Sequence, residues 1–233
     1  MGNGLLIAAT DTECGKTVLT CALIAYWRQY CSPRPLGVLK PIQSGEGDRE
    51  LFQQLFELEQ SLEELNPVFY QAPLAPPIAA ALENTTVDLA PAWQRYTTLK
   101  QQCDWLLVEG LGGLGSPITD EMTVVDMAAD WRLPVVLVVP VKLGAIANAV
   151  ANVALARQHR LQLQGIVLNC TTPEAEKNLE RLAPADMISN LTHVPMLGVL
   201  PYLSDPMDLN QLSSAARGLT LETIMPAAFW VAR

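Results

Sequence analysis

Six short apolar runs, rich in leucine and valine, are the feature that most restricts how this 233-residue chain can fold. Their hydrophobicity is continuous rather than alternating, which is typical of strands covered on both faces. The segments between them are long enough for helices. The pattern therefore predicts an α/β fold, a doubly wound and mainly parallel sheet with helices on both faces. The runs occupy residues 5–10, 35–40, 105–110, 135–142, 165–170 and 197–201.

Between the runs, six segments have the pattern of helices, and one segment does not. Residues 66–91 contain five prolines, so we expect an ordered loop over the functional site there. In the helix predicted at 145–159, Ile146, Val150 and Val153 should form the apolar face. We expect a single domain over residues 1–233. The helices are predicted at 16–29, 49–59, 91–102, 124–131, 145–159 and 174–182.

Composition excludes several classes of protein. The formal net charge of −9 and the absence of a basic stripe argue against a nucleic-acid-binding protein. No apolar run reaches the roughly 20 residues that a membrane helix needs. The five cysteines are widely spaced with no CxxC pair, which favours reduced thiols. We therefore expect a cytoplasmic enzyme or switch, in which a few lysines hold any anionic ligand.

The segment AATDTECGKTVLT, residues 8–20, has the context of a phosphate-binding loop, because it follows a predicted strand and leads into a predicted helix. Backbone N–H groups and the helix N-terminus attract an anion there. Lys16 would add a point charge, and Thr17 would offer its hydroxyl to Mg²⁺. The usual opening glycine is missing at both Ala9 and Thr10. Alanine follows such a loop wherever φ is negative.

Two other strand ends carry candidate residues. In the segment LLVEGLGG, residues 106–113, a buried strand is predicted to end with the carboxylate Glu109, which is followed by glycines. Glu109 is therefore a candidate second Mg²⁺ ligand, direct or through water. KPIQSGEGD places Lys40, Ser44 and Asp48 just after the second strand, where an anion site and a plain polar turn are equally consistent with the spacing. Taken one by one, Lys142, Asn148 and Asn169 are compatible with capping or surface positions.

Five blocks of sequence carry a resemblance to the dethiobiotin synthetase family over nearly the whole chain. TDTE before GKT is the most distinctive of them. The chain departs from the family pattern at Ala9, where the family has its first loop glycine, and at Cys170, where an aspartate is common. It also has no tyrosine in residues 173–183. The blocks are TDTECGKT, KPIQSG, NPVFYQAPLAPPIAA, DWLLVEGLGG and LPVVLVVPVKLGAIANA.

The resemblance implies a P-loop NTPase-like fold and a ligase of biotin biosynthesis that depends on Mg²⁺ and uses ATP as co-substrate. In that reaction 7,8-diaminononanoate takes up CO₂ as a carbamate, ATP phosphorylates the carbamate, and the second amine displaces phosphate to close the ureido ring. Phosphoryl transfer needs charge neutralisation and alignment more than covalent help. The resemblance also implies a homodimer, in which the neighbouring subunit holds the substrate tail around residues 142–148.

Matching positions imply a role for each site residue. The catalytic residues are Thr12, Lys16 and Lys40. The substrate-binding residues are Ser44, Lys142 and Asn148. The metal ligands are Thr17, Asp48 and Glu109. The nucleotide and its metal would be held by Glu13, Cys14, Gly15, Lys16, Thr17, Val18, Asp48, Glu109, Gly110, Leu111, Gly112, Asn169, Cys170, Pro201, Tyr202 and Leu203.

An alternative of a different class is a partition or cell-division ATPase, a switch protein that shares this fold. Such switches carry a signature lysine and two glycines before GKT, where this chain has Asp11, Thr12 and Glu13. The C-terminal PAAFWVAR also lacks a basic amphipathic helix of the kind that binds membranes. A related amidoligase is the nearer enzyme alternative, but it normally uses a glutamine-hydrolysing domain or partner. We therefore expect the ligase.

Overall fold

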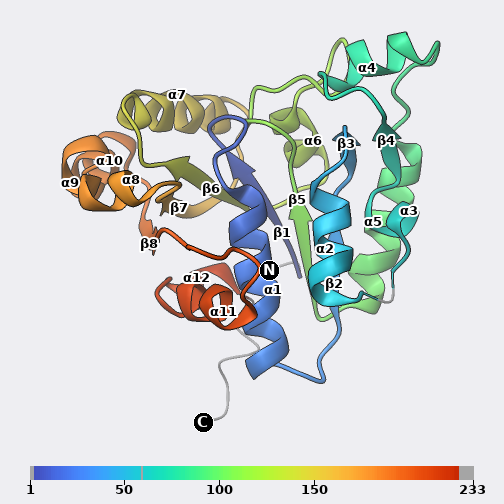
Figure 1. Cartoon of the computed structure of the whole chain (residues 1–233). Helices are drawn as coiled ribbons and strands as arrows, with labels where there is room; N and C mark the ends of the chain where they lie inside the picture. The colour runs from blue at the N-terminus through green and yellow to red at the C-terminus, as the bar shows by residue number, and fades with distance from the viewer. Residues whose placement is uncertain (1–2, 59, 226–233) are drawn as a thin grey trace.

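The computed structural model describes residues 3–58 and 60–225, and a six-stranded parallel sheet runs through its centre (Figure 1). The strand order is β2-β5-β1-β6-β7-β8. Each of the six predicted apolar runs forms one of these strands, which confirms the predicted fold class. The strands are β1 (Gly4–Ala9), β2 (Leu36–Leu39), β5 (Trp105–Glu109), β6 (Val135–Pro140), β7 (Leu163–Asn169) and β8 (Met196–Leu200).

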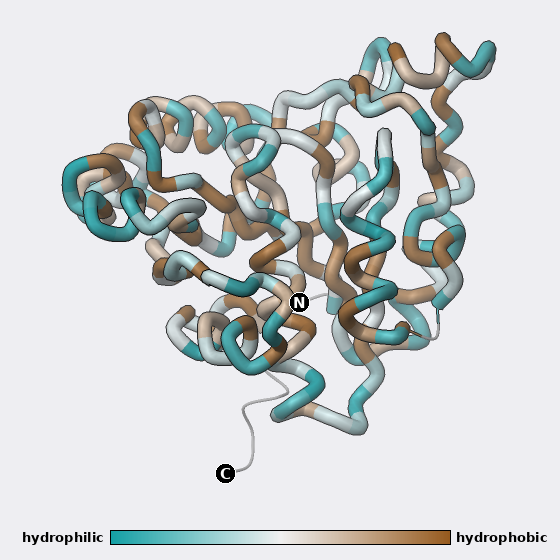
Figure 2. The backbone as a smooth tube through the Cα atoms, viewed as in Figure 1, coloured by the Kyte–Doolittle hydropathy of each residue, from teal (hydrophilic) through white to brown (hydrophobic). Residues whose placement is uncertain are grey.

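The sheet is covered on both faces, which explains why its strands are continuously apolar. Along β1, Leu6 and Ala8 pack into one core cluster, while Leu5, Ile7 and Ala9 pack into the other. Figure 2 shows hydrophobic colouring concentrated along these inner segments. Fully burying a leucine or isoleucine side chain stabilises the fold by roughly 1.5–3 kcal/mol. Alternating residues of one strand therefore contribute to two separate cores.

The helices pack in two layers on the sheet. Residues of α1, α2, α11 and α12 belong to the core cluster that contains Ile7, and residues of α5, α6, α7 and α10 belong to the one that contains Leu6. The helices are α1 (Lys16–Tyr30), α2 (Asp48–Phe56), α3 (Leu62–Leu65), α4 (Pro76–Leu82), α5 (Ala90–Gln102), α6 (Val124–Asp130), α7 (Ala145–Gln158), α8 (Pro173–Lys177), α9 (Leu179–Leu182), α10 (Ala185–Thr192), α11 (Leu209–Arg217) and α12 (Leu221–Ile224).

The proline-rich segment 66–91 differs from the prediction, because it contains regular structure. Strand β4 (Val68–Tyr70) pairs in parallel with β3 (Ile42–Ser44) as a separate two-stranded sheet. Helix α4 then begins with two prolines, Pro76 and Pro77. Proline is tolerated in the first helical turn, because the backbone N–H groups of that turn have no partner within the helix. The expectation of a loop without helix or strand is therefore wrong.

Three helix predictions also need correction. The helix expected at 174–182 is divided at Asn178 into α8 and α9. Helix α2 ends at Phe56 rather than at Glu59, because Glu57 adopts a left-handed φ of 41°; Glu59 itself lies outside the described residues. On α7 the buried positions are mainly small, and Val150 is 37% exposed instead of lying in the apolar face. The buried residues of α7 are Ala145, Ala149, Val153 and Ala156.

Within residues 3–58 and 60–225, no helix combines the length and the apolar character needed to cross a bilayer. The C-terminal sequence PAAFWVAR, which entered the argument against a membrane-binding switch, lies outside the described residues. All five cysteines are free thiols, as the spacing predicted.

Candidate active site

A cleft of about 730 Å³ opens where β1, β2 and β5 end. Ligands on parallel α/β sheets bind beyond the carboxyl ends of the strands, so this cleft lies where the fold places a site. Four segments far apart in the sequence contribute to it. The lining residues are Thr12, Glu13, Cys14, Gly15, Lys16, Thr17, Lys40, Gln43, Ser44, Glu46, Asp48, Pro73, Leu74, Ala75, Pro76, Leu111, Gly112, Ser116 and Pro117.

The loop between β1 and α1 has the backbone of a phosphate-binding turn. Gly15 caps α1 with a φ of 87°. A Cβ there would lie 1.9 Å from Asn169 Nδ2, so glycine is required both by conformation and by space. Glu13 also adopts a left-handed φ, of 52°. Ala9 is instead the last residue of β1, paired with Val138, so its departure from glycine introduces no backbone strain.

Lys16, the first residue of α1, points into the cleft mouth from a largely buried position. Its side chain is held by two carbonyl groups, donating to Gly112 O at 2.7 Å and to Asp11 O at 3.3 Å. Burial lowers the pKa of Lys16, and the charge of nearby Lys40 lowers it further. A bound anion in the loop would stabilise the charged form of Lys16 against both effects. The lysine is therefore placed to exchange its carbonyl partners for phosphate oxygens.

Lys40 is the second cation of the cleft and is 2% exposed. Its ammonium group contacts Asp48 Oδ2 and lies 2.8 Å from Glu109 Oε1. Burial by itself would lower the pKa of Lys40, but the two carboxylates outweigh that effect, so the pKa is raised. For Asp48 burial opposes ionisation, while Lys40 and the Thr17 hydroxyl hold the carboxyl pKa below its ordinary value. Lys40, Asp48 and Glu109 therefore form a charged network, and the segment that contains Lys40 and Asp48 is not a plain polar turn.

The three predicted metal ligands converge on one point. Thr17 Oγ1 lies 2.9 Å from Asp48 Oδ1 and 3.1 Å from Glu109 Oε1. Mg²⁺ prefers oxygen ligands and is commonly bound through one or two carboxylates together with substrate phosphates. The donor set therefore fits Mg²⁺. Among the described residues there is no group of three or more His, Cys, Asp or Glu side chains that could hold a metal ion. The site at Thr17 contains two carboxylates, so substrate phosphates would supply further ligands.

Ser44 and Thr12 both line the cleft. The Ser44 hydroxyl is buried and has no hydrogen-bond partner in the described part of the chain, although the residue lines the cleft. An unpaired buried hydroxyl carries a free-energy cost that a bound polar group would remove. Thr12 is exposed, and its backbone N–H donates to Asp11 Oδ1 at 2.8 Å.

Two residues that were predicted to hold the nucleotide, Asn169 and Cys170, are buried and contact other parts of the protein. Asn169 donates from Nδ2 to Cys14 O at 2.9 Å and is 3% exposed, so its amide braces the phosphate loop. Cys170 is 2% exposed and packs in the core. Tyr202, by contrast, is 37% exposed. Of the predicted nucleotide-site residues at positions 201–203, Tyr202 is the one with an exposed ring.

Lys142 and Asn148 lie outside the cleft lining. The Lys142 ammonium is half-exposed and sits 3.8 Å from Asp11 Oδ2. Asn148 is partly buried near the start of α7, and its carbonyl accepts a hydrogen bond from Asn152 Nδ2 at 2.9 Å. Between them Leu143 is 90% exposed. Within this one chain, the region 142–148 is thus separate from the charged network.

Sequence reasoning missed two side chains that support the site. Thr20 donates to Glu109 Oε2 at 2.5 Å, and the Ser116 hydroxyl accepts from Gly113 N at 2.8 Å, which orders the glycine loop. Thr20 had a signal in the sequence, because it lies one helical turn after Thr17 and so shares its face of the helix. Ser116 stands three residues after Gly113, and this spacing gave no comparable signal.

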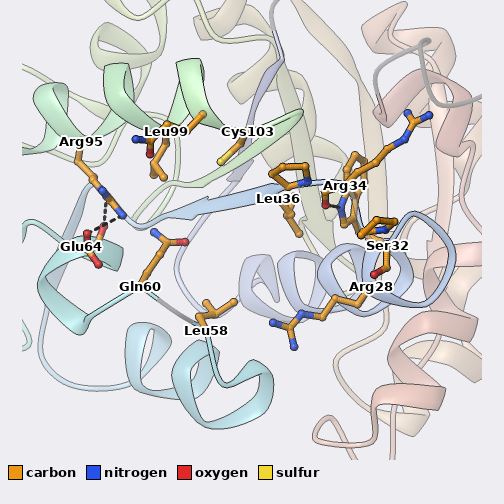
Figure 3. Close-up of a pocket in the computed structure, with 14 residues that line it drawn as sticks. Arg28, Ser32, Arg34, Leu36, Leu58, Gln60, Glu64, Arg95, Leu99 and Cys103 are labelled. Atoms are coloured by element: carbon orange, nitrogen blue, oxygen red, sulfur yellow. Dashed lines mark hydrogen bonds and ion pairs between the residues drawn. The ribbon is translucent and has the colours of Figure 1, made fainter.

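A larger groove, of about 980 Å³, lies at the other end of the sheet beside β2 (Figure 3). It is bordered by the end of α1, the start of β2, the segment around Gln60 and the end of α5. Arg95 there pairs with Glu64 at 3.2 Å, as the dashed lines show. Gln60 bonds both the N–H and the C=O of Val38, at 3.4 and 3.0 Å. These polar groups complete the fold rather than face a reacting centre.

Comparison with known proteins gives a consistent result. A family model described as an AAA domain matches residues 3–208. The ATP-dependent dethiobiotin synthetase BioD of Gloeothece citriformis is 54% identical, over 95% of this chain and 98% of that protein. The proteins of the same name from Crocosphaera subtropica and Bacillus cereus are 49% and 33% identical, over 94% and 92% of this chain and 98% and 90% of theirs.

Solved structures of low sequence identity share the fold. The cell division ATPase MinD of Pyrococcus furiosus aligns with a TM-score of 0.59 at 15% identity, over 96% of this chain and 98% of that one. A ParA family ATPase of Chlorobium tepidum aligns with a TM-score of 0.56 at 12% identity, over 95% and 97%. At these identities the likeness supports the architecture alone.

Proposed function

The chain belongs to the ATP-dependent dethiobiotin synthetase family, and we propose that it closes the ureido ring of dethiobiotin from 7,8-diaminononanoate, CO₂ and ATP. The observation that carries the proposal is Lys40, a second buried lysine beside the loop lysine, Lys16. Partition-type switches carry their additional signature lysine within the loop, before GKT, whereas Lys40 follows a different strand, β2. An enzyme that phosphorylates a carbamate needs a further positive charge for that second anion.

The reaction proceeds in three balanced steps. One amine of the substrate attacks CO₂ and loses a proton, which leaves a carbamate. A carbamate oxygen attacks the γ-phosphorus of ATP, and the bond to ADP breaks, giving a carbamic-phosphoric anhydride. The second amine then attacks the carbonyl carbon and loses a proton, while phosphate departs and the five-membered ring closes. Each step builds or moves negative charge within one small volume, so fixed cations are the main requirement.

The cleft residues take distinct parts in this scheme. Lys16 would neutralise the transferring phosphoryl group, and Lys40 would sit between that group and the carbamate. The Thr12 side chain borders the same space. Mg²⁺ held by Thr17, Asp48 and Glu109 would neutralise the nucleotide phosphates when bound. We propose the remaining loop residues and residues 110–112 as neighbours of the phosphates, Asn169 and Cys170 as further parts of the nucleotide site, and residues 201–203 as neighbours of the base.

The substrate would be held at two points. Ser44, whose buried hydroxyl has no partner among the described residues, would bind the diamine end. Lys142 and Asn148, which lie outside this chain's own cleft, would bind the tail across a homodimer. Leu143, which is 90% exposed between them, would lose apolar surface to such an interface. Sedimentation at micromolar concentration tests the dimer; a fully active monomer would overturn it.

One assay separates this function from the partition-type switch. Purified protein is incubated with ATP, Mg²⁺, bicarbonate and the diamine, and the product is detected by mass. We expect dethiobiotin with stoichiometric release of ADP and phosphate, dependent on all four components. ATP hydrolysis that proceeds equally without the diamine, with no ring product, would favour the switch. We further propose that the enzyme works in the cytoplasm on small molecules, without nucleic acid or membrane.

A further inference from the structure

Thr20 lies one helical turn beyond Thr17 on α1 and is fully buried. Its hydroxyl oxygen is 2.5 Å from Glu109 Oε2 and 3.0 Å from the carbonyl oxygen of Lys16. A hydroxyl has a single proton to donate. The carboxylate takes it, because a hydrogen bond to an ionised acceptor is shorter and roughly twice as strong as one to a neutral carbonyl.

The two oxygens of Glu109 therefore have different partners. Oε2 is engaged by Thr20, whereas Oε1 faces Thr17 and Lys40 at 3.1 and 2.8 Å. Glu109 is wholly buried, and a buried carboxylate oxygen without a donor is costly. The Thr20 hydroxyl thus removes one oxygen from the side of the carboxylate that faces the cleft.

We propose that Thr20 is a positioning residue that restricts Glu109 to a single metal-facing oxygen and so selects Mg²⁺ over larger divalent cations. The inference rests on the proposed function only in taking the Thr17, Asp48 and Glu109 cluster as the metal site. Mg²⁺ demands compact octahedral geometry, whereas Ca²⁺ accepts six to eight oxygens and commonly binds a carboxylate through both. A carboxylate with one oxygen already bonded suits the smaller ion.

The test measures metal binding directly. Mn²⁺ binding is followed by electron paramagnetic resonance in the presence of a non-hydrolysable ATP analogue, and Mg²⁺ and Ca²⁺ are then added as competitors. In Thr20→Val, which keeps the side-chain volume, we expect Mn²⁺ affinity to fall about tenfold or more, the range typical when a residue that orients a metal ligand is removed. The preference for Mg²⁺ over Ca²⁺ should also narrow severalfold.

Two further variants serve as controls. Thr20→Ser keeps the donor and should stay within about threefold of wild type in both measurements. Thr192→Val removes a hydroxyl that is equally buried but donates to a helix carbonyl, Ile188 O at 2.6 Å, so it reports the general cost of losing a buried threonine hydroxyl. It should leave Mn²⁺ binding unchanged.

Unchanged Mn²⁺ affinity and cation preference in a folded Thr20→Val protein would overturn the inference. So would a loss of equal size in Thr20→Ser, because that would attribute the effect to packing of the methyl group. If Thr20→Val does not fold, Thr20→Cys replaces it, because a thiol is a weaker hydrogen-bond donor than a hydroxyl. Mn²⁺ affinity must then fall in the order wild type, Thr20→Ser, Thr20→Cys, and any other order overturns the inference. None of these readouts requires ring closure, so they remain decisive even if wild-type protein makes no dethiobiotin.

Discussion

Two depressions in the described part of the chain lie at opposite ends of the sheet and differ in the arrangement of their charged side chains. The groove beside β2 is the larger, at about 980 Å³ against about 730 Å³ for the cleft. Its arginine at position 95 is paired with Glu64, and its Gln60 amide completes the edge of the sheet. In the cleft, Lys16, Lys40 and Glu109 are all buried and converge. The volume of a depression is therefore a poor indicator of the active site, and a cluster of buried charged side chains is a better one.

Loss of Lys16, the lysine of the phosphate loop, should reduce activity more than any other substitution and so test most directly whether the cleft is the active site. We expect Lys16→Ala to reduce product formation on the order of 10²-fold or more, because it removes the charge placed between the phosphates. Steady-state kinetics with product detected by mass provide the measurement. Lys177→Ala, an exposed lysine on α8, is the control. Near wild-type turnover in Lys16→Ala would mean that the cleft is not the site of phosphoryl transfer.

Substitution of Lys40, the second cation of the cleft, should affect ring closure without affecting nucleotide binding. In Lys40→Gln we expect nucleotide affinity to stay within about threefold of wild type, while ring closure falls on the order of 10²-fold, since the carbamate loses its fixed positive charge. Calorimetric titration with nucleotide, beside product formation from the diamine, tests both parts. Product formation within about threefold of wild type would remove Lys40 from the chemistry.

The carboxylate at the end of β5 should affect the metal more than the nucleotide. We expect Glu109→Ala to raise the Mg²⁺ concentration needed for half-maximal rate by more than about tenfold, because a direct ligand matters at least as much as the residues that orient it. Activity is measured over a Mg²⁺ titration at saturating ATP. Glu222→Ala, exposed on α12, should leave the titration unchanged. A matching Mg²⁺ curve for Glu109→Ala would exclude it as a ligand.

A substitution in the groove should have the smallest effect, and it should change the stability of the protein without changing its activity. Removing the two Gln60 hydrogen bonds to Val38 in Gln60→Ala should lower the free energy of unfolding by about 1 kcal/mol, as expected for exchanging such bonds for water. Urea denaturation tests this, with Gln54→Ala, exposed on α2, as control. Kinetic constants should stay within about twofold of wild type. A large loss of activity at unchanged stability would give the groove a functional role.

Some features of the molecule were readable in the chain because they are local or follow from sheet geometry. The phosphate loop is contiguous, so Lys16 and Thr17 could be identified from their place between an apolar run and a helix. Glu109 and Lys40 follow buried runs of their own. Because the ends of parallel strands meet at one edge, their convergence could also be expected.

Other features were not readable, because local sequence is ambiguous where packing decides. Pro76 and Pro77 are compatible both with a loop and with the first turn of a helix, and the helix is stable because Ala79 and Ala80 pack against the core. On α7 the helical period is correct, but the sheet accepts small residues there. Val150 therefore remains exposed although it is more apolar than its buried neighbours.

The sequence by itself determined the parallel sheet, the phosphate loop and the acidic and basic residues at the strand ends, since each depends on order along the chain. Only the tertiary structure decided which oxygen of Glu109 faces Thr20 and which faces Lys40, and that Asn169 fills the space beside Gly15. Thr20 and Glu109 are 89 positions apart. Contacts over such separations depend on how helices and strands pack together, and hydrogen bonding discriminates between arrangements that differ by less than 1 Å.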